Sequence, residues 1–171
     1  AILKKQLNQR CLFKGGADNP FLTPRGVGLH NNLLAVSDTG KNRVLVWSKF
    51  NQTEYQEPDV ILGQMESQGT DRNTGMEVNA SSLQYPSGIW TNGKKLIVAD
   101  AWNHRVLVWH TMPMKHGQPA DVVIGQPHFN TNFPNVEGLS KPCTSQSLYW
   151  PYGVCSNGHE LWIADTGNRR I

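Results

Sequence analysis

Three aspartates, each followed within a few residues by an arginine, are the side chains of this sequence whose types and spacing suggest chemistry. The three groups are Asp38 with Arg43, Asp100 with Asn103 and Arg105, and Asp165 with Asn168 and Arg169. A carboxylate that ends a strand can accept backbone N–H bonds in an Asx-type turn, and an arginine can bridge neighbouring strands. The pattern occurs in three copies, whereas a catalytic residue is expected in one or two only. We therefore interpret these residues as structural.

The histidines and cysteines give no clear metal site. The six histidines, at positions 30, 104, 110, 116, 128 and 159, form no pair with the spacing of zinc ligands. No Cys-x-x-Cys occurs among Cys11, Cys143 and Cys155, which argues against a zinc knuckle or haem attachment. A Cys143–Cys155 disulfide is the favoured pairing, because Cys143 lies in the loop that leads to the strand of Cys155. We predict no catalytic residue and no cofactor, while a central Ca²⁺ or Zn²⁺ remains an alternative.

Composition restricts the partners only weakly. The chain has 171 residues, 16 Lys and Arg against 13 Asp and Glu, and a net charge of +3, with no basic run or acidic tail. Charge therefore names no partner. No apolar stretch approaches the ~20 residues that span a bilayer, which predicts a soluble chain without a membrane span.

The elements that must position these side chains recur along the sequence. Prolines 24, 86 and 151, each two residues before a glycine, recur at intervals of 62 and 65 residues. Each opens a short apolar strand, an Asn-rich hairpin turn and a second strand that ends at the aspartate. The first strands are expected at 27–29, 89–90 and 154–155, and the second at 33–36, 96–99 and 161–164.

The third strands indicate how the repeats pack. Residues 44–47 and 106–109 are apolar at every position, so both faces must be covered. A fourth strand follows at 59–64 and 121–126, and no segment has helical spacing. Four-stranded units covered on both faces predict an all-β protein, a β-propeller with about three blades at 24–64, 86–126 and 151–171, the third incomplete. Residues 1–20 lack the repeat and are expected to be an N-terminal extension, a closing strand or an interface arm.

The second copy resembles the signature of the NHL-repeat family. Its sequence is Asp100-Ala-Trp-Asn-His-Arg105; the third copy has arginine in the histidine position, and the first has Lys41-Asn42 there. The long repeat is similar to a bacterial subset of that family. Such propellers usually have six blades, so the resemblance implies that half a propeller is present and that the remaining blades come from the same polypeptide or a second chain. It also implies an exported protein, periplasmic or extracellular.

Strand order predicts where a ligand would bind. Turns between second and third strands share one end of the blades with the connectors 65–84 and 127–149, and long loops on one rim usually carry function. The middle residues of the Pro-x-Gly motifs start the innermost strands on that face. We therefore predict ligand binding by Arg25, Ser87, Tyr152, Trp102 and His104.

Three functions fit this face. The favoured one is a non-catalytic scaffold that recognises a protein or an extended ligand, because aromatic residues and arginine dominate such interfaces. A metal-dependent lyase or hydrolase is the alternative implied by similar six-bladed enzymes such as the peptidylglycine-amidating lyase, but the zinc-binding histidines before the opening prolines are absent here. RNA binding, implied by animal NHL proteins, is disfavoured because Glu66, Asp71, Glu77 and Glu137 dilute the basic residues.

Overall fold

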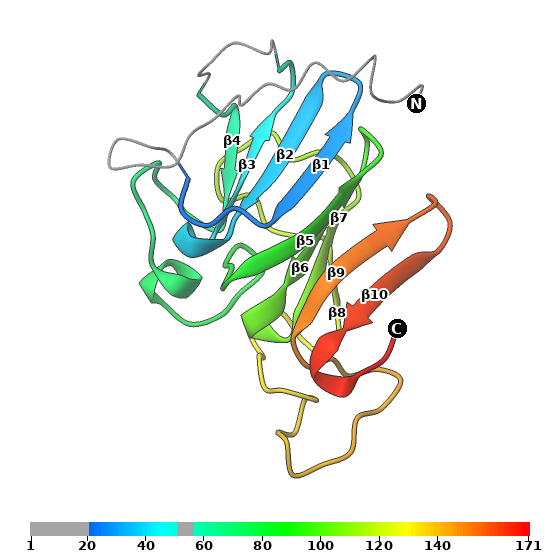
Figure 1. The fold of residues 1–171 in the computed structure, drawn as a ribbon. Coiled ribbons are helices and arrows are strands. Elements are labelled where there is room, and N and C mark those ends of the chain that lie inside the picture. The colour runs from blue at the N-terminus through cyan, green and yellow to red at the C-terminus, as the bar shows by residue number, and fades with distance from the viewer. Residues whose placement is uncertain (1–20, 51–56) are drawn as a thin grey trace.

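The computed structural model describes residues 21–50 and 57–171, which form an all-β fold of three antiparallel sheets (Figure 1). The first sheet contains β1 (Gly26–His30), β2 (Leu33–Asp38), β3 (Arg43–Trp47) and β4 (Val60–Leu62). The second contains β5 (Pro86–Thr91), β6 (Leu96–Asp100), β7 (Arg105–Trp109) and β8 (Val122–Ile124). The third contains β9 (Pro151–Ser156) and β10 (Leu161–Asp165).

The prediction of an all-β fold is confirmed, and the observed strands lie within the three predicted repeats. Helical structure among the described residues is limited to the 3-10 turns η2 (Thr39–Lys41), η3 (Arg72–Gly75), η4 (Ala101–Asn103) and η5 (Thr166–Asn168). No helix in the described part of the chain has the length and apolar character needed to cross a membrane. The sheets of residues 21–50 and 57–171 do not close into a ring. The predicted N-terminal extension, residues 1–20, lies outside the described residues.

The second sheet is packed between the other two. Val98, Leu107 and Trp109 belong to the apolar cluster shared with the first sheet. The alternate residues Ile97 and Val106 belong to the cluster shared with the third sheet. Because successive strand residues point to opposite faces, every residue of β7 is buried. The prediction that the third strand is covered on both faces is therefore confirmed.

The glycines of the Pro-x-Gly motifs allow neighbouring strands to approach closely. The first strand of the second sheet, β5, contacts the first strands of the other two sheets, β1 and β9. A Cβ atom at Gly88 in β5 would lie 2.8 Å from both the Tyr152 carbonyl oxygen and the Val154 nitrogen of β9. At Gly26 it would collide with the Ser87 carbonyl oxygen. A side chain at either glycine would therefore push two sheets apart.

The two outer sheets leave apolar side chains in solvent. Val27 and Leu29 on β1 are 66% and 65% exposed, and Trp162 on β10 is 45% exposed. Trp162 alternates with Leu161 and Ile163, which pack against the second sheet. Its ring therefore lies on the opposite face of β10.

Candidate functional site

The aspartates that end β2, β6 and β10 are buried, and each pairs with an arginine that follows five residues later. The Nε to Oδ2 distances are 2.8 Å for Arg43–Asp38, 2.8 Å for Arg105–Asp100 and 2.7 Å for Arg170–Asp165. In the third copy we predicted Arg169 in this role, and that was wrong. Arg169 takes the left-handed conformation that ends η5, with φ of 57°, and the next residue turns back to the carboxylate.

The other oxygen of each aspartate holds the incoming chain. It accepts the backbone N–H of Leu22, Gln84 or Tyr149, at 2.6, 2.7 and 2.8 Å. Each donor lies sixteen residues before its acceptor, so the predicted local Asx-type turns are wrong. The 3-10 turns form their hydrogen bonds within their own backbone; the His104 N–H, for example, donates to the Ala101 carbonyl. The aspartate carboxylates are therefore left to accept the backbone N–H groups of the connectors. These contacts confirm that the connectors and the turns after the second strands share one end of the fold.

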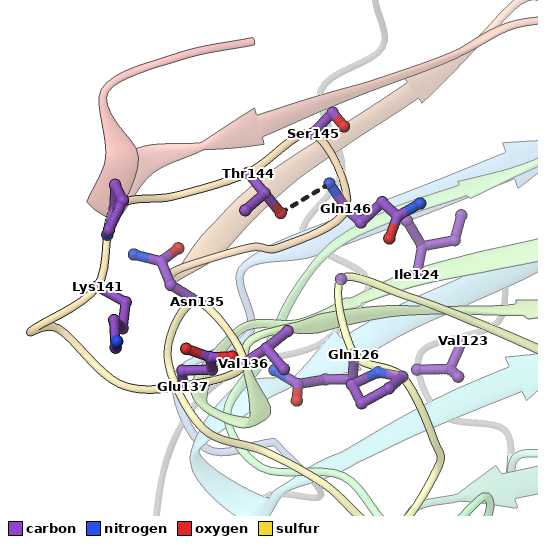
Figure 2. A pocket seen from close by; sticks show the side chains of 13 residues that line it. Val123, Ile124, Gln126, Asn135, Val136, Glu137, Lys141, Thr144, Ser145 and Gln146 are labelled. Carbon is purple, nitrogen blue, oxygen red and sulfur yellow. Dashed lines mark hydrogen bonds between the residues drawn. The ribbon is translucent and has the colours of Figure 1, made fainter.

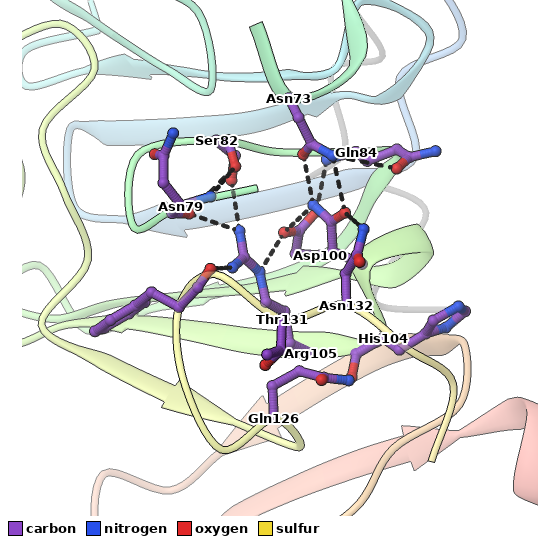
Figure 3. A network of polar contacts seen from close by, with 12 residues as sticks. Asn73, Asn79, Ser82, Gln84, Asp100, His104, Arg105, Gln126, Thr131 and Asn132 are labelled. Carbon is purple, nitrogen blue, oxygen red and sulfur yellow. Dashed lines mark hydrogen bonds and ion pairs between the residues drawn. The ribbon is translucent and has the colours of Figure 1, made fainter. Parts of the chain in front are cut away.

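Two pairs of asparagines attach the connectors to the turns. Asn103 and Asn73 donate to each other's side-chain oxygens at 2.8 and 3.1 Å, and Asn168 and Asn135 do so at 2.8 and 3.0 Å. The sequence analysis identified Asn103 and Asn168 but missed both partners. A signal was present, since each partner lies nine residues after the glutamine of a Gly-Gln pair. Asn103 also donates to Oδ2 of Asp100 at 2.8 Å, and Figure 3 shows Asn73 beside Asp100.

Arg105 is the centre of the most buried polar network (Figure 3). Besides Asp100 it donates to the carbonyl oxygens of Phe129, Asn79 and Ser82, at 2.6, 2.9 and 2.9 Å. Burial raises the pKa of the Asp100 carboxyl, and the guanidinium of Arg105 opposes that rise. The network therefore joins both long connectors to the second sheet.

His104, a predicted ligand-binding residue, is buried and joins two sheets. Its Nδ1 accepts the backbone N–H of Trp150 at 3.2 Å, as Oδ1 of Asn42 accepts that of Tyr85 at 2.8 Å one repeat earlier. Burial lowers the pKa of His104 from 6.5 to about 4, against a smaller opposing effect of Asp165. The ring is therefore neutral at pH 7, as an Nδ1 acceptor must be. Its exposed surface is only 8%.

Four side chains form a continuous row across the three sheets, which we call the aromatic strip: Arg25, Tyr85, Trp102 and Tyr152. The Arg25 guanidinium lies 4.8 Å from the Tyr85 ring centre and donates to its hydroxyl at 2.8 Å. The Tyr85 and Trp102 ring centres are 4.9 Å apart, and Nε1 of Trp102 donates to the Tyr152 hydroxyl at 3.2 Å. Trp102 is 44% exposed, and Arg25 is also exposed.

Three of the five predicted ligand-binding residues therefore meet in one row. Arg25, Trp102 and Tyr152 come together through Tyr85, whereas His104 and Ser87 do not join them. Ser87 is 3% exposed and lies within the packed start of β5. The strip presents ring faces, two phenol hydroxyls and one cation, groups that suit planar, apolar or carbonyl-bearing ligands.

The remaining predictions concern metals and cysteines. Within residues 21–50 and 57–171, no group of three or more His, Cys, Asp or Glu side chains is placed to hold a metal ion. Cys143 and Cys155 are free and exposed, so the pairing that the sequence favours is not formed; Cys11 lies outside the described residues.

Comparison with models of protein families finds no matching family, and comparison with curated proteins finds no significant similarity. The function of the chain is therefore inferred from its own residues.

Proposed function

We propose that this chain is a non-catalytic binding module whose aromatic strip recognises a protein or another extended ligand. The observation that carries the proposal is the unbroken row of contacts from Arg25 through Tyr85 and Trp102 to Tyr152. Tryptophan, tyrosine and arginine are the residues that most often dominate binding energy at interfaces. Their mutual contacts hold the rings in place before a ligand arrives, which lowers the entropy lost on binding.

We further propose that the three sheets are consecutive blades of an NHL-type β-propeller. Three features support this: the order of the strands within each sheet, the contacts of β5 with β1 and β9, and the burial of β7 between neighbouring sheets. The exposed Val27, Leu29 and Trp162 are the surfaces on which further blades would pack. Those blades, from the same polypeptide or a second chain, are then the first partners of this chain, and the strip borders the central channel.

A phage-displayed library of random linear peptides tests the binding proposal. Peptides enriched on the wild-type chain should bind at least about 30-fold more weakly to Trp102→Ala, the loss of ~2 kcal/mol expected for an interface hot spot. Trp162→Ala is the matched control, because Trp162 is 45% exposed and Trp102 44%. It should change affinity less than twofold.

Two outcomes contradict the proposal. One is a set of enriched peptides whose binding is unaffected by Trp102→Ala. The other is binding of a random RNA pool that persists at physiological salt and is lost in Trp102→Ala, which would assign the strip to nucleic acid.

A further inference from the structure

A second surface, separate from the aromatic strip, lies beside the last strand of the second sheet. A cavity of about 730 Å³ separates β8 from the connector 127–149 (Figure 2). Val123 and Ile124 of β8 line one side, and Val136 and Ser145 of the connector line the other. Both sides therefore carry apolar surface together with polar backbone.

The same place in the first sheet is filled. Residues 60–62 of β4 are all buried, whereas residues 122–124 of β8, at the same repeat positions, are all partly exposed. Leu62, for example, is 1% exposed and belongs to the cluster that contains Leu107 and Trp109 of β7. The third strand of one repeat thus covers the fourth strand of the repeat before it.

The loop between β7 and β8 completes that cover by hydrogen bonds. Gly117 donates its N–H to the Ile61 carbonyl at 2.8 Å, and Nδ1 of His116 accepts the Ile61 N–H at 3.0 Å. Ala120 donates to the Ala80 carbonyl at 2.9 Å. The whole segment 105–124 is therefore a hairpin fitted to one groove.

The cavity is lined by the residues that occupy the repeat positions of the two carbonyl acceptors, Ile61 and Ala80. By repeat position, Val123 corresponds to Ile61 and Ser145 to Ala80, and both line the cavity. Within the described residues, the edge of β10 opposite β9 is paired only at Asp165, which bridges to Arg170, whereas the counterparts β2 and β6 pair along both edges. A strand added to β10 would lie over β8, as β7 lies over β4.

We propose that this cavity docks a β-hairpin with the chemistry of residues 107–124. Its first strand pairs with β10, with leucine opposite Ile163 and tryptophan opposite Leu161, as Leu107 pairs with Val98 and Trp109 with Leu96 in the second sheet. In its loop, a glycine N–H donates to the Val123 carbonyl, and a histidine ring nitrogen accepts the Val123 N–H. Strand addition of this kind gains affinity from the main chain and specificity from alternate side chains.

A labelled synthetic peptide with the sequence of residues 107–126 tests the proposal by fluorescence anisotropy against the full chain, whose own Arg170 already occupies the place of Arg105 beside Asp165. It should bind saturably, and Ile124→Asp in the chain or Trp109→Ala in the peptide should each weaken binding at least tenfold. Met76→Asp is the control, because Met76 is 73% exposed and lies in the other connector, 65–84, outside the residues that line the cavity, and it should change binding less than twofold. A loss in Met76→Asp as large as that in Ile124→Asp would show that the peptide does not bind at the cavity and would overturn the proposal.

A chain with the hairpin joined covalently tests the same proposal if the free peptide binds weakly or is insoluble. The sequence of residues 107–126 is joined after Ile171, so that Arg170-Ile171 takes the place of Arg105-Val106. Hydrogen exchange of the β10 amides should slow at least tenfold relative to the original chain, and Ile124→Asp should abolish that protection. Unchanged exchange in the extended chain overturns the proposal, as does a dimer of the original chain that protects the same amides without any added hairpin.

Discussion

Replacing Arg105 with methionine tests whether the repeated Asp and Arg residues hold the fold together. Methionine keeps much of the side-chain length and removes every donor. Arg105 makes four hydrogen bonds, to Asp100 and to three backbone carbonyls, and neither charged side chain of the pair is exposed. The same change at Arg170 is the matched control. Arg170 contacts Asp165 and the Ser147 carbonyl, and its side chain is 33% exposed.

The contacts set the size of the two effects. Removing one partner of a buried ion pair costs about 3–5 kcal/mol, because the other charge remains buried without compensation. The three carbonyls left by Arg105 add to that cost unless water reaches them. A partly exposed pair contributes about 1 kcal/mol or less, so we expect Arg170→Met to cost roughly 1–2 kcal/mol. The ion pairs alone give a difference of about 1–4 kcal/mol, and the carbonyls that lose Arg105 raise the expected difference to at least about 2 kcal/mol.

Urea unfolding followed by tryptophan fluorescence and far-UV circular dichroism measures both free energies of unfolding. An Arg105→Met chain that does not fold agrees with the expectation, because its loss approaches the whole stability of a small domain. An Arg105→Met chain that folds with a stability within about 1 kcal/mol of Arg170→Met would refute the reasoning. The network in Figure 3 would then be a consequence of the fold rather than a support for it.

Three further predictions concern single positions. The pKa of His104 falls from 6.5 to about 4 on folding, so its contribution to stability is complete above pH 6.5 and is lost as the pH falls toward 4. The free energy of unfolding, measured in urea between pH 7.5 and 4.5, should therefore decline more steeply in the wild type than in His104→Asn. The difference in slope is at most about 1.4 kcal/mol per pH unit, and less because the ring is partly solvated. Parallel curves for the two chains would contradict this. Gly88→Ala should cost about 1–3 kcal/mol in urea unfolding, whereas at Gly153 a Cβ would meet only the Ala164 Cβ, at 3.2 Å, so equal costs for the two variants would contradict the proposed backbone contact. Trp102→Gly should leave the melting temperature within about 4 °C of the wild type while it abolishes peptide binding, and a larger drop would assign Trp102 to the core.

The repeated pattern made the fold predictable, because each strand, turn and aspartate occurs more than once. Apolar residues at every position of 106–109 indicated a strand covered on both faces, and β7 is one. The errors came from contacts between distant residues. A single sequence does not reveal that Asp100 binds a backbone N–H sixteen residues earlier. The choice of Arg169 over Arg170, by contrast, overlooked the five-residue spacing from aspartate to arginine in the first two copies.

The candidate site was predictable only in part, because exposure depends on neighbouring sheets. Ser87 and Tyr152 hold the same position in their repeats, yet Ser87 is 3% exposed and Tyr152 is partly exposed. Tyr85, which joins Arg25 to Trp102, directly precedes a repeat-opening proline, as Trp150 does in the third repeat. Its N–H binds Asn42 and its ring lies in the strip, so Tyr85 connects two sheets and also belongs to the candidate site.

Comparison of the three turns gives the strongest reason to regard Trp102 as functional. The equivalent residues are Gly40 and Gly167, and a Cβ at either would collide with the preceding connector, at the Leu22 carbonyl or the Tyr149 ring. All three residues donate a backbone N–H to that connector, at 2.8 Å from both glycines but at 3.2 Å from Trp102. The second repeat thus keeps a large, half-exposed ring where the turn favours glycine. Residues retained against local structural preference are the ones expected at binding sites, and Trp102 is the member of the aromatic strip that fits this description.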